Sequence, residues 1–210
     1  MGFNLPKIYP ITDRKLAGVS HQQQISQFAS GGATFAQVRE KLLSPRDFYE
    51  EAAEAVRIAR DAGVRIILND RVDFALALSA DGVHLGQDDL PPEQARMILG
   101  EKAIIGFSTH SVEEAVDALK LPIDYIAIGP IFPTATKPDH APIVGIEGLR
   151  RIRAAAGRFP IVAIGGIDRL NVMEVFRAGA DSAGIISDLF CKPMDIASSI
   201  RELLRISSEG

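Results

Sequence analysis

Short apolar segments alternate with longer helical patterns along the whole chain, and this alternation limits the fold more than any other feature. Eight segments are predicted to be strands, and several are nearly continuous in Ile, Val and Ala, which is typical of parallel strands covered on both faces. They span residues 7–12, 34–39, 64–68, 82–85, 103–107, 125–129, 161–164 and 183–186. Eight βα units favour closure of a parallel sheet. We therefore expect an α/β fold, a (β/α)8 TIM barrel that forms a single compact domain over residues 1–210.

The predicted helices lie between these strands. The clearest spans residues 45–62, because Ser44 can cap it, Pro45 suits its first position and Gly63 follows its end. Further helices are expected at residues 22–30, 72–79, 92–99, 111–120, 147–156, 171–178 and 194–204. The structural alternative is an open doubly wound sheet, which would more often carry fewer strands and a GxGxxG fingerprint after the first strand. Here the first strand is followed by Thr12-Asp13-Arg14, so we favour the barrel.

The charge balance excludes some partners. The chain has 23 basic and 27 acidic residues, for a formal net charge of −4, whereas a nucleic-acid or anionic-membrane surface would need a broad basic face. No apolar run approaches the roughly 18 residues that span a bilayer. The first residues lack the basic and apolar stretches of a signal peptide, and Cys191 is the single cysteine, expected to be a small buried hydrophobe. We expect a cytoplasmic protein whose partners are small molecules.

Polar residues and glycines gather where the strands end. Seven of the eight predicted strands lead directly into such a cluster, whereas the loops from helix to strand are plainer. Because the carboxyl ends of parallel strands meet at one rim of a barrel, where active sites of this fold lie, we expect an enzyme. The clusters cover residues 37–41, 69–71, 86–89, 108–110, 129–139, 165–166 and 187–188.

Two aspartates in these clusters could hold a metal ion. Asp70 and Asp89 end neighbouring strands, so their carboxylates could share one hard cation, and Mg2+ is the natural choice beside phosphate. Either residue could instead cap the helix that follows it. Asp88 competes with Asp89 for the ligand role. The presence of two aspartates on adjacent strand ends favours the metal.

Basic residues and a glycine pair on the same rim could bind phosphate. Arg39, Lys41 and Lys137 could converge as cationic ligands, although isolated lysines are usually solvated surface charges. Gly165-Gly166 and Ile186-Ser187 follow the seventh and eighth strands, the recurrent phosphate site of this fold. The glycine pair could equally be a bare tight turn. Its position in the barrel makes it informative.

The four histidines differ in their expected roles. His84 lies within the fourth strand and is expected to be a satisfied residue of the barrel core. His110 lies on the rim, where it could reach a ligand or cap a helix. His21 and His140 are expected to be exposed. No Cys/His spacing indicates zinc, and no Ser-His-Asp set stands out.

Taken together, the motifs resemble those of the thiamine-phosphate synthase family. The matching stretches are YPITDR, GGATFAQVREK, ILNDRVDFALALSADGVHLGQDDL, IGFSTHS, YIAIGPIFPTATKPD and IVAIGGI, with a weaker match at GADSAGIIS. They follow one another in the family's order over nearly the whole chain. GVHLGQDD and GPIFPTATK together are highly specific.

The resemblance implies a Mg2+-dependent alkyl transfer in which a thiazole phosphate displaces diphosphate from an aminopyrimidine methyl diphosphate. It implies Mg2+ at Asp70 and Asp89 and catalytic roles for Arg39, Lys41, Ser108 and Lys137. The pyrimidine diphosphate would meet Gln37, Arg39, Lys41, Asn69, Ser108 and Lys137, and the thiazole phosphate Thr134, Thr136, Gly166, Ile186 and Ser187. The same motifs add Val38, Glu40 and Ala135 to the substrate site.

Two alternatives and one departure from the family pattern remain. A thiazole tautomerase on the same barrel would lack the second metal aspartate and the PTxTK loop, and both are present here. A non-catalytic phosphate-binding paralogue would not need Asp70, Asp89 and Lys137. Asp188-Leu189-Phe190 differs from the usual small apolar run, and an acid beside a phosphate site would repel the ligand. We therefore expect Asp188 to turn away, toward a helix cap or a basic side chain. A homo-oligomer is left open.

Overall fold

Eight parallel strands form the centre of the computed structural model, which describes residues 4–134, 142–191 and 195–208. All eight strands lie where the sequence predicts them, with ends shifted by at most two residues. Their bounds are β1 Ile8–Pro10, β2 Phe35–Val38, β3 Arg65–Asn69, β4 Gly82–Leu85, β5 Ile104–Thr109, β6 Tyr125–Ile128, β7 Ile161–Ile164 and β8 Ser182–Ile185.

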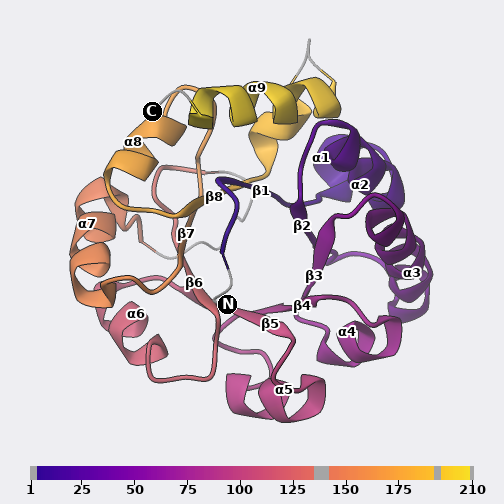
Figure 1. The fold of residues 1–210 in the computed structure, drawn as a ribbon, viewed down its shortest axis with the longest axis horizontal. Coiled ribbons are helices and arrows are strands. Elements are labelled where there is room, and N and C mark those ends of the chain that lie inside the picture. Colours follow the sequence, from indigo (N-terminus) through magenta and orange to yellow (C-terminus); the bar gives the residue numbers. More distant parts are fainter. Residues whose placement is uncertain (1–3, 135–141, 192–194, 209–210) are drawn as a thin grey trace.

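The strands close into a barrel. Each strand pairs with its neighbours in chain order, and β1 pairs with β8. Closure between β1 and β2 is made just past the end of β1, where Ile11 bridges Gln37 and the Thr12 N–H donates to the Gln37 carbonyl at 2.9 Å. Figure 1 shows the resulting ring of strands inside a ring of helices. The expected (β/α)8 barrel is therefore confirmed.

The helices follow the strands in turn. Those expected from the sequence are α2 His21–Ser30, α3 Pro45–Asp61, α4 Val72–Leu78, α5 Pro92–Leu99, α6 Val112–Ala118, α7 Gly145–Ala156, α8 Val172–Arg177 and α9 Ile196–Ser208. The Ser44 side chain caps α3 by accepting the Asp47 N–H, as predicted. Two four-residue helices, α1 Arg14–Ala17 and the 3-10 helix η1 Ser187–Phe190, were not predicted. Four residues are too few to show a helical period.

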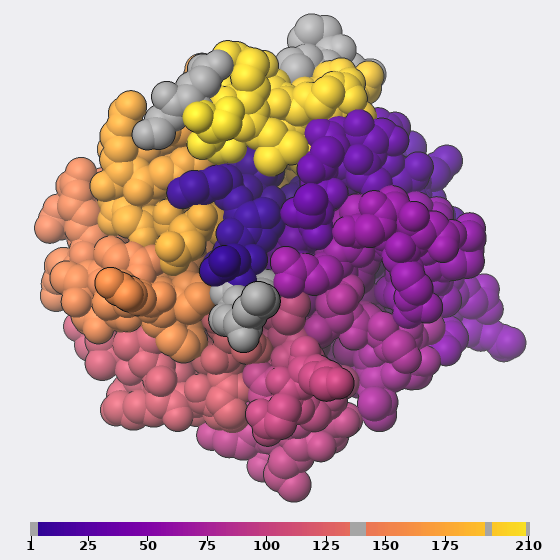
Figure 2. Space-filling view, in the orientation of Figure 1, coloured from indigo at the N-terminus to yellow at the C-terminus, as the bar shows by residue number. Residues whose placement is uncertain are grey.

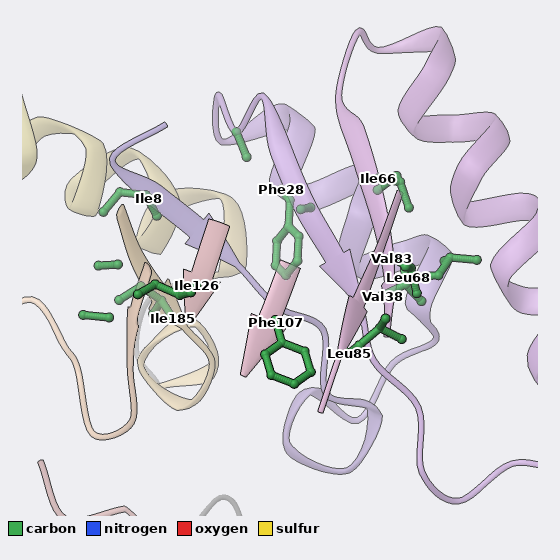
Figure 3. Packing of buried hydrophobic residues seen from close by; sticks show 14 of the residues in the cluster. Ile8, Phe28, Val38, Ile66, Leu68, Val83, Leu85, Phe107, Ile126 and Ile185 are labelled. Carbon is green, nitrogen blue, oxygen red and sulfur yellow. The ribbon is translucent and has the colours of Figure 1, made fainter. Parts of the chain in front are cut away.

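Side chains alternate along each strand between two cores. One set, including Ile8, Val38 and Ile126, points outward and packs beneath the helices (Figure 3). The other set points into the barrel and forms a smaller cluster, made of Tyr9, Phe35, Ile67, Ile104, Tyr125, Ala127 and Val162. The barrel interior is therefore filled rather than open.

The amino-terminal segment lies across the barrel on the face shown in Figure 2, where its indigo residues cross the middle of the ring. Leu5 packs there against the interior cluster. This leaves the opposite rim, at the carboxyl ends of the strands, for ligand access. Among the helices of the described residues, none combines the length and the apolar character needed to cross a membrane.

Candidate active site

A cavity of about 350 Å3 lies at the carboxyl ends of the strands, and every strand or the loop after it contributes to its wall. Eleven of the residues expected in the site line it. They are Gln37, Arg39, Lys41, Asn69, Asp70, Asp89, Ser108, Thr134, Gly166, Ile186 and Ser187. Ala135, Thr136 and Lys137 lie outside the described residues. The cavity therefore brings together eleven expected residues that are as much as 150 positions apart in the chain, from Gln37 to Ser187.

Val38 and Glu40 do not line the cavity. Val38 is fully buried on the outer face of β2, because it alternates with Gln37, whose side chain points into the barrel. The same alternation was available in the sequence and could have excluded Val38 from the substrate site. Val38 therefore has a packing role rather than a ligand contact in this structure.

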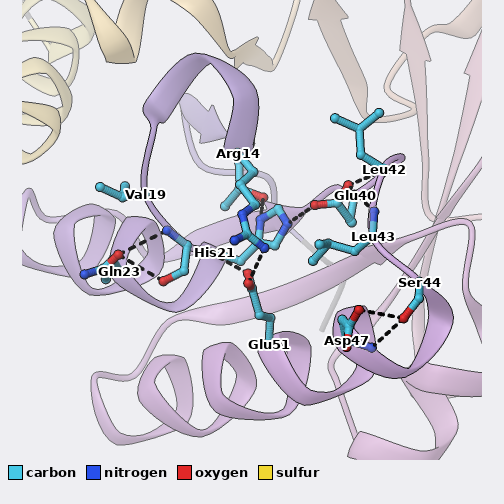
Figure 4. A network of polar contacts seen from close by, with 12 residues as sticks. Arg14, Val19, His21, Gln23, Glu40, Leu42, Leu43, Ser44, Asp47 and Glu51 are labelled. Atoms are coloured by element: carbon cyan, nitrogen blue, oxygen red, sulfur yellow. Dashed lines mark hydrogen bonds and ion pairs between the residues drawn. The ribbon is translucent and has the colours of Figure 1, made fainter.

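Glu40 instead fixes the loop that carries Arg39 and Lys41. Its side chain is only 4% exposed, and its Oε2 lies 2.9 Å from Nε2 of His21 on α2 (Figure 4). Its Oε1 accepts the backbone N–H groups of Lys41, at 2.6 Å, of Leu42, and of Leu43, at 3.2 Å. Glu40 thus stabilises the turn formed by residues 41–43.

His21 completes this support, and the expectation that it is exposed was wrong. The residue is fully buried. Its Nδ1 lies 2.8 Å from Oγ1 of Thr12, which also accepts the Arg39 N–H at 3.0 Å. The partners that bury it come from other elements, so no local pattern in the sequence indicated them. His21, Thr12 and Glu40 together anchor both ends of the loop.

Protonation of Glu40 should weaken this support. Burial alone would raise the pKa of Glu40, but the Leu42 N–H, the His21 ring and two further N–H groups outweigh burial and lower it below its ordinary 4.5. A carboxyl whose pKa falls on folding adds stability that is complete above its unfolded pKa and lost as the pH falls through the folded one.

We therefore expect Glu40→Gln to lower the melting temperature by roughly 2–8 °C at pH 7, the equivalent of about 1–2 kcal/mol in a chain of this size. The difference from the unmodified protein should shrink below about pH 4.5. Thermal unfolding followed by circular dichroism between pH 3 and 7 measures it. Glu50→Gln, an exposed glutamate of α3, is the control. Equal effects of the two substitutions at pH 7 would contradict the role given to Glu40.

Asp70 and Asp89 lie together at the ends of β3 and β4. The pKa of Asp89 is raised, first by burial and then by the neighbouring Asp70 carboxylate, while the Gly86 N–H, which donates to Asp89 Oδ2 at 2.7 Å, opposes the shift. Asp70 also forms an ion pair with Lys41. A hard divalent cation bound between the two carboxylates would relieve their mutual repulsion.

Two carboxylates are too few to enclose a metal ion with protein ligands alone, but they suit Mg2+. Within the part of the chain that the structure describes, no group of three or more His, Cys, Asp or Glu residues could hold a metal ion. Mg2+ is usually bound through one or two carboxylates, with substrate phosphates and waters filling its other positions. Asp70 and Asp89 match that pattern.

The opposite wall of the cavity is made by Gly165, Gly166 and Ser187. Gly166 has φ +66°, and a Cβ there would lie 2.5 Å from the Pro133 carbonyl oxygen and 2.8 Å from the Phe132 Cβ. A side chain is excluded at this position both by the backbone conformation and by the close approach of the loop after β6. The glycine pair therefore lets two loops meet at the cavity.

Asp188 turns away from the cavity, as expected. It does not line the wall, and its carboxylate accepts from Nε of Arg169 at 3.2 and 3.1 Å. The ion pair with Arg169 therefore keeps the Asp188 carboxylate from facing the predicted phosphate site. Cys191, three residues on, is exposed, so the expectation that it is buried was wrong.

His84 has the core position expected of it. Its Nδ1 lies 3.0 Å from the Tyr125 hydroxyl, and its Nε2 lies 2.8 Å from Oγ of Ser108. Burial lowers the pKa of His84 to about 4, so its ring is neutral at pH 7. His110 lines the cavity on the rim, and its N–H donates to Glu114 at 2.8 Å. His140 lies outside the described residues.

Comparison with known proteins identifies the family of the chain. Residues 8–189 match the family model described as thiamine monophosphate synthase. The thiamine-phosphate synthase of Chloroflexus aurantiacus is 46% identical over 96% of this chain and 93% of that protein. That of Methanospirillum hungatei is 46% identical over 93% of this chain and 94% of that protein. The solved structure of thiamine phosphate pyrophosphorylase from Pyrococcus furiosus has a TM-score of 0.86 at 38% identity, covering 97% of this chain and 96% of that one.

Proposed function

Because the chain belongs to the thiamine monophosphate synthase family and is a transferase of thiamine biosynthesis, we propose how its cavity performs the reaction. The substrates are an aminopyrimidine methyl diphosphate and a thiazole phosphate, and the products are thiamine phosphate and diphosphate. The observation that carries the proposal is that the cavity has two walls of different chemical character. Asp70, Asp89 and Lys41 lie on one wall, and Gly166 and Ser187 lie on the other.

The wall around Asp70 and Asp89 suits the diphosphate. Asp70 and Asp89 would hold Mg2+, which when bound would neutralise part of the charge on the departing diphosphate. Lys41, already beside Asp70, and Arg39 add cationic groups that can contact its oxygens. Lys137 is proposed to join them, on the family pattern alone. The charge that develops on the leaving group is thereby met by groups that are already in place.

Gln37, Asn69 and Ser108 line the cavity next to these charged groups and are proposed to hold the pyrimidine diphosphate. The bond between the exocyclic carbon and the diphosphate oxygen breaks, and its electron pair leaves with the diphosphate. The amino group of the pyrimidine stabilises the positive charge left on the carbon. The protein therefore mainly orients and shields the reacting carbon.

The wall around Gly166 and Ser187 is proposed to hold the thiazole phosphate, with Thr134 and Ile186 beside it. The thiazole ring nitrogen then supplies the electron pair that forms the new C–N bond. This reaction needs no protein nucleophile. The Asp188–Arg169 pair is consistent with phosphate binding here, because it keeps the carboxylate engaged outside the cavity wall.

Ser187 and its neighbour Asp188 should respond differently to substitution, because only Ser187 lines the cavity. Ser187→Ala is expected to weaken thiazole phosphate binding by roughly 0.5–3 kcal/mol, the worth of one hydrogen bond to a neutral or charged partner. Asp188→Ala should leave the affinity within about twofold and lower the melting temperature, because the ion pair between Arg169 and the Asp188 carboxylate is lost. Calorimetric titration with the thiazole phosphate measures the first effect. A sharp gain in affinity in Asp188→Ala would mean that its carboxylate faces the ligand.

Substrate omission tests the proposed reaction. The protein is mixed with both substrates and Mg2+, and thiamine phosphate is measured by its conversion to fluorescent thiochrome. We expect product only when both substrates are present, and a strong loss of rate when Mg2+ is removed by chelation. Absence of thiamine phosphate in the complete mixture would refute the proposal. Cytoplasmic location remains a proposal that rests on the soluble substrates.

A further inference from the structure

A line of five polar side chains runs through the barrel from Gln37 to Ser108, both of which line the cavity. Nε2 of Gln37 donates to the Tyr9 hydroxyl at 2.9 Å, which lies 3.0 Å from the Tyr125 hydroxyl. The Tyr125 hydroxyl lies 3.0 Å from Nδ1 of His84, whose Nε2 lies 2.8 Å from Oγ of Ser108. The three middle residues connect two residues of the cavity wall that belong to different strands, β2 and β5.

The middle of this line is buried and tightly packed, although Tyr9 and His84 also contribute to the cavity wall. Tyr9 is 1% exposed, Tyr125 is fully buried and His84 is 7% exposed. The His84 and Tyr125 rings stack with their centroids 5.6 Å apart. Gly106 makes room for the Tyr125 ring, because a Cβ there would lie 2.0 Å from Tyr125 Cζ. Such a buried line keeps its hydrogen bonds formed, since breaking any of them leaves a polar group unsatisfied.

The amide of Gln37 sets the direction of the hydrogen bonds. Its nitrogen can only donate, so the Tyr9 oxygen accepts and the Tyr9 hydrogen is available to Tyr125. Continued in one direction, Tyr125 donates to Nδ1 of His84, and the Nε2–H of His84 donates to Ser108. The Ser108 hydroxyl hydrogen is then left for a ligand, and Gln37 has its amide oxygen to offer. The line thus presents an acceptor at one end and a donor at the other.

We propose that Tyr9, Tyr125 and His84 are positioning residues that couple Gln37 to Ser108, so that the cavity accepts a hydrogen bond at Gln37 and donates one at Ser108. A flip of the Gln37 amide would reverse every bond in the line and exchange the two roles. The choice of donor or acceptor at Gln37 therefore determines the choice at Ser108.

This coupling rests on the proposed function for its chemical meaning. The amino group of the pyrimidine is a donor, which suits the amide oxygen of Gln37. The diphosphate is an acceptor, which suits the hydroxyl hydrogen of Ser108. The hydrogen bond to the diphosphate strengthens as negative charge develops on it, so loss of the coupling should lower kcat more than it raises KM.

The histidine tautomer tests the line without any substrate. Protein labelled with 15N in its four histidines is examined by NMR at pH 7, and Tyr49→Phe and His84→Gln variants serve as the control and the assignment. We expect His84 to carry its proton on Nε2 and to accept at Nδ1. Tyr125→Phe removes the donor to Nδ1 and should increase the share of the other tautomer. A proton on Nδ1 of His84 in the unmodified protein would overturn the proposed direction.

A double-mutant cycle separates coupling from general destabilisation. Tyr125→Phe and Ser108→Ala are each expected to lower kcat about tenfold, the worth of roughly one hydrogen bond. If Tyr125 acts through Ser108, the two effects will not add, and Tyr125→Phe in the Ser108→Ala background will change kcat little. Tyr49→Phe, at the exposed surface of α3, should leave kcat unchanged. Full additivity would refute the coupling.

The proposed function and the proposed coupling can be refuted independently. If the unmodified protein forms no thiamine phosphate, the proposed function is wrong, while the tautomer of His84 still decides whether the line exists as described. If the protein is active but His84 is protonated on Nδ1, or the cycle is additive, the coupling is wrong and the proposed function stands.

Discussion

Asp89→Asn is expected to lower kcat/KM for thiamine phosphate formation by about 100- to 1,000-fold, the usual effect of removing one preorganised electrostatic group from an active site. The substitution keeps the shape of the side chain and removes its charge. With a single carboxylate left at the ends of β3 and β4, the concentration of Mg2+ needed for half-maximal rate should rise as well. Steady-state rates over a range of Mg2+ concentrations measure both effects.

Asp88→Asn is the matched control, because Asp88 precedes Asp89, lines the same cavity and is exposed. We expect a small effect on the rate and none on the Mg2+ dependence. Asp70→Asn provides a second test. Asp70 has φ +62°, a conformation that asparagine also tolerates, so a loss of rate would report the charge rather than backbone strain. A larger effect of Asp88→Asn than of Asp89→Asn would assign the metal to the other residue.

Gly82→Ala is expected to destabilise the barrel by about 3 kcal/mol or more, or roughly 6–12 °C in melting temperature. Gly82 pairs with Ile104 across β4 and β5, and a Cβ at this position would lie 1.8 Å from the Ile104 carbonyl oxygen. The clash is with backbone, so no side-chain rotation can relieve it. Thermal unfolding by circular dichroism gives the shift, and soluble yield on expression gives a second readout if the variant fails to fold.

Gly184→Ala is the control for this prediction. Gly184 also lies within a barrel strand, but a Cβ there would come no closer than 3.3 Å to the side chain of Ile164. That side chain can move by a few tenths of an ångström, so a small shift in melting temperature is expected. Equal destabilisation by the two substitutions would show that strand glycines matter here for their flexibility rather than for the space they leave.

The barrel could be predicted because it depends on local patterns. The strands are short apolar runs, and β4, β7 and α5 begin and end where the pattern predicts. The placement of Asp70 and Asp89 at one rim then follows from the parallel direction of the strands. What failed were judgements about single side chains. The burial of His21 depends on Glu40 and Thr12, which only the folded chain brings to it.

The line from Gln37 to Ser108 could not be predicted either, because its residues come together only in the folded chain. Tyr9 and Tyr125 lie 116 residues apart, and each alone is an ordinary aromatic residue of a strand. Their hydrogen bond depends on the barrel closing and on the space above Gly106. Glu40, by contrast, was assigned to the substrate because it lies between Arg39 and Lys41, whereas in the fold it turns beneath them. Adjacent residues on a strand end need not share a face.

The central claim, that one cavity joins the two substrates, is tested most directly by 31P NMR of a single reaction. Unmodified protein, both substrates and Mg2+ are mixed, and the phosphorus signals of substrates and products are followed together. We predict that thiamine phosphate and inorganic diphosphate appear one for one as the pyrimidine diphosphate and the thiazole phosphate disappear. Diphosphate release without consumption of the thiazole phosphate, or conversion of the thiazole phosphate alone, would contradict the account.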